Sequence, residues 1–257
     1  MNYAKHYFNI TERHDVEYAS TIKEIADNYF DYLKKNKNLL MSRYYNDGHG
    51  IYIQYIHIDP KTIYRDLWIG LTYKKEKLFS KTNPQLNIVN NSALEKFDVD
   101  GTLHYAITLY ILDDQFDIDS VIDLVSESPI WNKALYHELT HYIDIIKQAT
   151  YKNSLGKNYD FDFGDENTKN VIANLKRYHN LSDEINAHFI QTATVILKHD
   201  IGHVTLENFK KMFIHFYGDS EFESLTKENK QKVLKRIYLF YIDLKEKKLN
   251  QKEPNNL

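Results

Sequence analysis

The chain has 257 residues, of which 42% are hydrophobic, and a formal net charge of −3. This length suits one catalytic unit of moderate size, and the near-neutral charge argues against a non-specific nucleic-acid binder. The absence of cysteine excludes disulfides and iron–sulfur clusters, so any metal must be bound by His, Asp or Glu. No secretory signal and no apolar stretch of membrane-spanning length is visible, which predicts a cytoplasmic protein with no membrane partner.

The predicted elements begin with a helix and continue with strands. Apolar residues recur at helical spacing between about Thr11 and Lys35. β-Branched and aromatic residues then predict four strands, at Ile51–Ile58, Asp66–Tyr73, Gln85–Val89 and Leu103–Leu112. The last is almost wholly apolar, as expected of a central strand covered on both faces. The third follows Pro84, so Gln85–Asn90 is either an edge strand to which an extended substrate adds or an ordinary strand.

Helical patterns dominate the rest of the chain. A short helix near Ser120–Val125 precedes a longer one over Pro129–Gln148, and the polar stretch Thr150–Asn167 is predicted to be a surface loop. Further helices are predicted at Lys169–Arg177, Ser182–Lys198, Leu206–Tyr217 and Lys227–Lys248. The order predicts an α+β fold, with a helix, a small mixed sheet and a long helix in residues 1–149. A helical part in residues 150–257 completes one catalytic unit.

The long helix carries the most informative pattern, His137-Glu138-Leu139-Thr140-His141. Two histidines four residues apart lie on one helix face and can present imidazole nitrogens to one zinc ion. Glu138 lies beside them, where it can take a proton from an activated water and pass it to a leaving amine. The other residues from Ala134 to Ile143 are uncharged, which is expected of a buried active-site helix. The alternative is a helix with two surface histidines that bind no metal.

A third ligand must come from elsewhere, because Lys147 occupies the position at which a further histidine would follow on the same helix. The best candidate is Glu184. Ser182 is a predicted N-cap, which places Glu184 in a helix's first turn, near its positive end. Two other carboxylates compete less well: Asp183 would point about 100° away around that helix, and Asp144 is short and two turns from His137.

The pairing of His137-Glu138-x-x-His141 with a later Glu184-x-x-Ala187 resembles the gluzincin group of zinc metallopeptidases. The segment Glu184–Phe189 is similar to the glutamate helix of ImmA/IrrE-type peptidases and of small phage-encoded metallopeptidases. The resemblance covers only residues 130–148 and 181–195, and Thr140 stands where the ImmA/IrrE group often has glycine. It implies a zincin-like fold, zinc held by His137, His141 and Glu184, and a location in host cytoplasm or virion for a phage-encoded protein.

Four more residues are candidates for supporting roles. Asp144 either orients a ligand histidine or forms a salt bridge with a nearby lysine. His188, one turn after Glu184, either supports the ligand carboxylate or the oxyanion, or is a partly exposed polar residue. Tyr178 and His179 are further oxyanion candidates just before the same helix.

The sequence therefore predicts a zinc-dependent peptidase, a hydrolase that cuts peptide bonds in a protein or peptide by means of zinc-activated water. The alternative from a different class is a zinc-stabilised structural or regulatory protein of the same fold that no longer cuts. Intact Glu138 argues against this alternative, because a structural site needs ligands and no base. A lesser variant keeps hydrolysis but acts on another substrate, such as a peptidoglycan cross-link. Nothing in the sequence indicates an oligomeric state.

Overall fold

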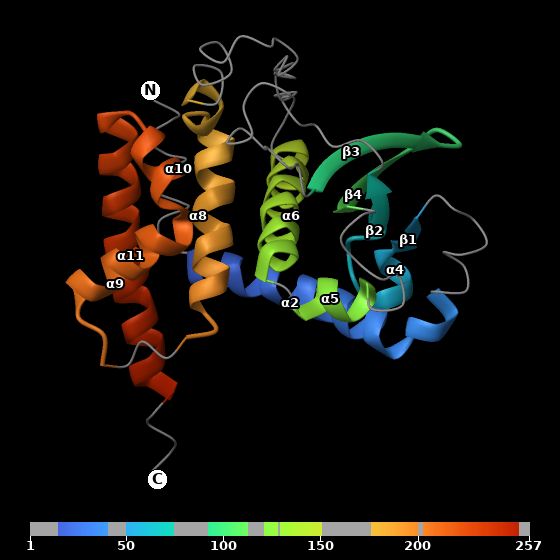
Figure 1. The fold of residues 1–257 in the computed structure, drawn as a ribbon, viewed down its shortest axis with the longest axis horizontal. Coiled ribbons are helices and arrows are strands. Elements are labelled where there is room, and N and C mark those ends of the chain that lie inside the picture. Colours follow the sequence, from blue (N-terminus) through green and yellow to red (C-terminus); the bar gives the residue numbers. More distant parts are fainter. Residues whose placement is uncertain are drawn as a thin grey trace. The chain divides into compact units, whose positions relative to one another are not determined.

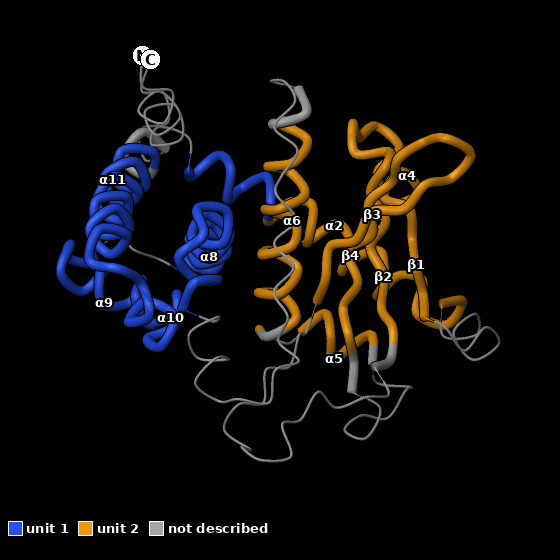
Figure 2. Tube along the Cα trace, turned by 90° about the horizontal axis from the view of Figure 1, so that it is seen from above, with its two compact units in different colours: residues 1–22, 160–257 blue, residues 23–159 orange. Residues whose placement is uncertain are grey.

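The computed structural model describes residues 15–40, 50–74, 92–112, 121–127, 129–150, 176–199 and 203–251. The chain divides into two compact units (Figure 2): a sheet unit, Lys23–Tyr159, and a helical unit formed by Met1–Ile22 with Asp160–Leu257. The predicted strand Gln85–Val89, with its edge-strand interpretation, and nearly all of the predicted loop Thr150–Asn167 lie outside the described residues.

The sheet unit contains a four-stranded mixed sheet in the order β1 (Ile51–Gln54), β2 (Leu67–Lys74), β4 (Thr102–Leu112) and β3 (Ser92–Val99). Both outer pairs are antiparallel, whereas β2 and β4 are parallel. A two-residue turn with positive φ at Asp100 (53°) and Gly101 (76°) joins β3 to β4, as expected of an Asp-Gly hairpin. β4 is thus internal, as its apolar sequence predicts. β3, which the sequence did not predict, forms an edge of the described sheet.

The predicted strand Ile51–Ile58 is wrong in its second half. Only Ile51–Gln54 pairs with β2, and Tyr55–Ile58 forms a helical turn, α4. β2 begins at Leu67, which pairs only with β4, so the chain beyond Gln54 has no strand partner for its backbone amides. The helical turn provides a hydrogen-bond partner within the segment itself, because the Asp59 amide donates to the Tyr55 carbonyl at 2.9 Å.

Besides α4, the described helices of the sheet unit are α5 (Val121–Glu127), α6 (Pro129–Thr150) and most of α2 (Asp15–Lys35), whose first residues belong to the helical unit. α6 packs on one face of the sheet (Figure 1). The buried apolar residues of this layer are Leu67, Ile69, Leu71, Ile107, Leu109, Leu135 and Leu139. Burial of each such side chain contributes about 1.5–3 kcal/mol to folding stability, so apolar packing holds α6 on the sheet.

The helical unit contains α8 (Ser182–Ile196), α9 (Leu206–Tyr217), α10 (Asp219–Ser224) and α11 (Lys227–Gln251). Three of these helices match the predictions, and α10 was not predicted. Phenylalanines from α8, α9 and α11 form its core: Phe189, Phe209, Phe213 and Phe240. Together the two units confirm an α+β fold. Within the described residues, no helix combines the length and apolarity that crossing a bilayer requires.

Candidate metal centre

α6 presents the two histidines of the sequence motif side by side. The Nε2 atoms of His137 and His141 are 3.1 Å apart, and their ring centroids are 4.7 Å apart. This spacing fits a hydrogen bond in which one ring donates to the other. It is also close to the about 3.3 Å that separates two nitrogen ligands of a tetrahedral zinc ion with bonds of about 2.05 Å. The predicted pair is therefore assembled by one helix alone.

α6 is attached to the sheet at two points on either side of this pair. The Trp131 indole N–H donates to the Tyr110 carbonyl of β4 at 3.2 Å. The Tyr142 hydroxyl donates to Asp66 at 2.8 Å, and its ring meets Tyr105 of β4 edge-on with centroids 5.5 Å apart. The attachments are eleven residues apart, about 16 Å along a helix. The histidines and Glu138 lie between them, so their side chains start from a fixed backbone.

Thr140 is a polar residue on the buried side of α6, and its hydroxyl is hydrogen-bonded within the helix. The side chain is fully buried, and its hydroxyl donates to the Tyr136 carbonyl of the preceding turn at 2.8 Å. The hydroxyl is therefore satisfied within the helix.

Glu138 points toward the sheet's β3 edge. Its Oε1 accepts a hydrogen bond of 2.8 Å from the hydroxyl of Ser92, the first residue of β3. The Tyr110 pKa is raised, chiefly by burial, and the carboxylates of Glu95 and Glu138 add to this shift. Glu138 thus lies half-buried between α6 and β3, and the sequence contained no signal for its serine partner.

Glu184 lies in the first turn of α8, as predicted, although the predicted cap is wrong. Leu181 is the N-cap and Ser182 is the first helical residue, and no side chain caps the helix. The Ile185 amide instead donates to the Leu181 carbonyl at 2.9 Å. Glu184 is buried, with 6% of its surface exposed, whereas its neighbour Asp183 is exposed. The two adjacent carboxylates therefore differ in burial, as expected if they point in different directions around the helix.

Asn180 fixes the chain just before α8. Its side-chain amide donates to the carbonyl of Ser224 at 3.0 Å and to that of Lys176 at 2.6 Å. Its Oδ1 accepts from the Thr226 amide at 2.7 Å and from Asn229 at 2.9 Å. One side chain thus joins the start of α8 to the end of α10 and the start of α11, and it holds the turn from which Glu184 projects.

The predicted supporting residues of the helical unit, Tyr178, His179 and His188, lie in a cluster of aromatic side chains. His188 lies edge-on to His179 (5.8 Å between centroids) and tilted against Tyr217 (5.5 Å). His179 Nδ1 is 3.0 Å from the hydroxyl of Ser224, and its ring lies 5.8 Å from that of Tyr178. Burial raises the pKa of Tyr217, and the Glu184 carboxylate adds a smaller increase. His188 is therefore a partly exposed residue, as one interpretation predicted, and it packs within an aromatic cluster.

Asp144 is half-buried on α6 and acts electrostatically on Lys147. Partial burial lowers the pKa of the Lys147 amine, and the Asp144 carboxylate opposes this shift. This coupling corresponds to one of the two interpretations of Asp144, a charge interaction with a lysine of the same helix.

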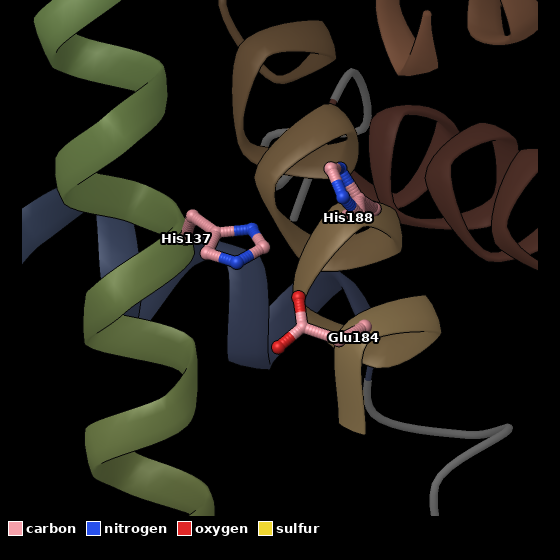
Figure 3. A group of neighbouring side chains, drawn as sticks. All are labelled: His137, Glu184 and His188. Carbon is pink, nitrogen blue, oxygen red and sulfur yellow. The ribbon is translucent and has the colours of Figure 1, made fainter. Parts of the chain in front are cut away.

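Each unit supplies potential metal ligands (Figure 3): His137 lies on α6 of the sheet unit, and Glu184 and His188 lie on α8 of the helical unit. Glu184 and His188 are one helical turn apart, the same spacing as His137 and His141. From the sequence, His188 was predicted only to have a supporting role. This repeated spacing was the available signal that His188 is also a potential ligand.

Comparison of the chain with family models, with curated proteins and with solved structures finds no match. The interpretation of this centre therefore rests on its own residues and their chemistry.

Proposed function

We propose that the protein is a zinc-dependent peptidase in which His137, His141 and Glu184 hold the ion and Glu138 is the catalytic base. The observation that carries the proposal is the convergence of the His137 and His141 Nε2 atoms, 3.1 Å apart, beside a carboxylate on a helix attached to the sheet on either side of this pair. A helix whose histidines bind no metal would not need two converging imidazoles with a carboxylate beside them.

The residues present fit zinc. Two imidazole nitrogens and one carboxylate are among the ligand sets that zinc accepts, and three protein ligands leave its fourth position open for catalysis. Glu184 supports this assignment because a buried carboxylate is costly without a compensating charge. Its place in the first turn of α8 provides part of that compensation through the helix dipole, and a bound cation would provide more.

When bound, zinc would lower the pKa of a water molecule and polarise the scissile carbonyl. Glu138 would take a proton from that water as oxygen attacks the carbonyl carbon. It would then deliver the proton to the amine nitrogen as the carbon–nitrogen bond breaks. β3, an edge of the described sheet next to Glu138, is the strand that would pair with an extended substrate. The substrate would accordingly be an unfolded or extended segment of a protein or peptide.

His188 gives the alternative function a specific basis. Structural zinc sites are closed by four protein ligands, whereas catalytic sites keep one position open. If His188 joined His137, His141 and Glu184 as a ligand, the site would be closed and the protein would be a zinc-stabilised structural or regulatory one. Glu138, which such a site does not use, favours the peptidase.

The test combines metal analysis with proteolysis. We expect about one zinc per chain, lost in His137→Ala and His141→Ala, and cleavage of a denatured protein mixture that a chelator abolishes. His188→Ala separates the two functions, because it should retain zinc if the site is open and lose it if His188 closes the site. A purified chain that holds no zinc, gains no thermal stability from added zinc and cuts nothing contradicts the proposal.

A further inference from the structure

We infer that Ser92 is a positioning residue for the Glu138 base. Its Oγ donates a hydrogen bond of 2.8 Å to Oε1 of Glu138, across 46 residues of sequence. The inference rests on the proposed function and adds to it a residue that lies outside both motifs. Ser92 opens the edge strand β3, so this bond also connects the base with the strand proposed to pair with substrate.

Both ends of the bond are held by the rest of the sheet unit. Ser92 pairs with Leu109 of the internal strand β4, and Leu109 is fully buried. Glu138 lies on α6 between the Trp131 and Tyr142 attachments to the sheet. Both backbones are already ordered by this packing, so forming the bond costs no further backbone entropy. The hydroxyl therefore restrains the carboxylate at a small entropic cost.

A restraint of this kind is useful because the last torsion of a glutamate is soft. The carboxylate can otherwise rotate over a broad range. A hydrogen bond to Oε1 fixes the plane of the group and leaves Oε2 to meet the water, which must lie within about 2.6–3.2 Å for proton transfer. A hydroxyl can both donate and accept, so Ser92 can remain bonded before and after Glu138 takes the proton.

The kinetic test compares Ser92→Ala with Ser92→Thr. Misplacement of a reacting group by about 1 Å can cost about a hundredfold, so we expect Ser92→Ala to lower kcat about ten- to hundredfold with little change in KM or in zinc content. Ser92→Thr keeps the hydroxyl and suits a strand, so it should restore most of kcat. Ser126→Ala is the matched control, because it also removes a serine hydroxyl that donates a hydrogen bond, in this case to the backbone carbonyl of Asp123 in α5. It should leave kcat unchanged.

A second test needs neither zinc nor turnover. Ser92→Ala, Glu138→Ala and the double variant are unfolded thermally in the presence of a chelator, with fluorescence of Trp68 and Trp131 as the probe. If the two side chains are bonded, the double variant melts close to the less stable single variant, since the second change removes nothing further. Additive losses in melting temperature would contradict the contact.

The outcomes separate the inference from the function on which it rests. A wild-type chain that cuts peptides in a zinc-dependent way, together with a Ser92→Ala variant that keeps its kcat, overturns the role of Ser92 alone. A kcat loss in Ser92→Ala that Ser92→Thr does not restore also overturns it, because the defect then follows the substitution and not the hydroxyl. A wild-type chain without zinc-dependent cleavage overturns the proposed function and the positioning role with it.

Discussion

The sheet unit and the helical unit hold their candidate ligands in different ways. In the sheet unit, His137, Glu138 and His141 lie within one and a half turns of α6, half-buried, on a helix attached to the sheet. In the helical unit, Glu184 is almost fully buried, and the turn that carries it depends on the hydrogen bonds of Asn180.

The difference teaches that the two parts have different structural requirements. The α6 part needs only helical spacing and a fixed helix. The α8 part needs a tertiary environment that tolerates a buried carboxylate, which is unfavourable without compensation. Variants of α6 should therefore change chemistry with little effect on folding, whereas variants around α8 should change folding as well. Both tryptophans, Trp68 and Trp131, lie in the sheet unit, so their fluorescence reports on that unit alone.

Glu138→Gln is expected to have the largest effect. It removes the base but leaves a side chain of the same shape that can still accept from Ser92, so kcat should fall by about 10²–10⁴-fold. Zinc content and melting temperature should match those of the wild type. Full activity in this variant would refute the role of Glu138. A large loss of stability would instead show that Glu138 also contributes to the folding of the sheet unit.

Asp15→Ala should be the most destabilising change in the helical unit. The Asp15 carboxylate accepts two hydrogen bonds from Arg236, at 2.7 and 2.8 Å, and Asp15 is buried. The guanidinium also lies 4.0 Å over the Phe189 ring of α8. Removing one partner of a buried ion pair costs about 3–5 kcal/mol of unfolding free energy, because the other charge remains uncompensated.

The measurement is denaturant unfolding followed by circular dichroism and by tryptophan fluorescence. The helical signal should lose stability more than the fluorescence signal. Glu17→Ala is the matched control: it removes a carboxylate of the same helix that forms an exposed pair with Lys247, and it should change stability by less than about 1 kcal/mol. Equal shifts in both signals would contradict the independence of the two units.

Glu184→Ala should weaken zinc binding by more than about a hundredfold, since even residues that only support a ligand typically contribute about 10–100-fold. The adjacent Asp183→Ala removes an exposed carboxylate of the same charge and should leave affinity nearly unchanged. Competition with a chromophoric chelator measures both. Equal affinities for the two variants, or a greater loss for Asp183→Ala, would remove Glu184 from the ligand set.

Asn180→Ala should have the smallest effect of the four. Loss of the amide leaves hydrogen-bonding groups at Ser224 and Thr226 without this partner, which costs about 1–3 kcal/mol of unfolding free energy. Because the turn before Glu184 loosens, zinc affinity should also fall modestly. Asn208→Ala, on the exposed first turn of α9, is the control and should change neither quantity. Unchanged stability in Asn180→Ala would show that α8 is positioned by its apolar packing alone.

Much of this protein follows from local patterns in its sequence. The helices α6, α8, α9 and α11 and the strands β2 and β4 match their predictions, because each is specified by the period or the continuous run of its own apolar residues. The pair His137 and His141 was predictable for the same reason. Four residues apart on a helix means one face, whatever the helix packs against.

Only the tertiary structure decided the rest. β3 has weak apolar alternation and exists because it pairs with β4 through an Asp-Gly turn, and the second half of Ile51–Ile58 is helical because no strand extends opposite it. The Ser92–Glu138 bond and the Asp15–Arg236 pair join residues that are distant in sequence. No local pattern encodes such contacts. Their energies depend on burial and on partners that chain folding brings together, so they could be known only once the strands and helices had been placed within each unit.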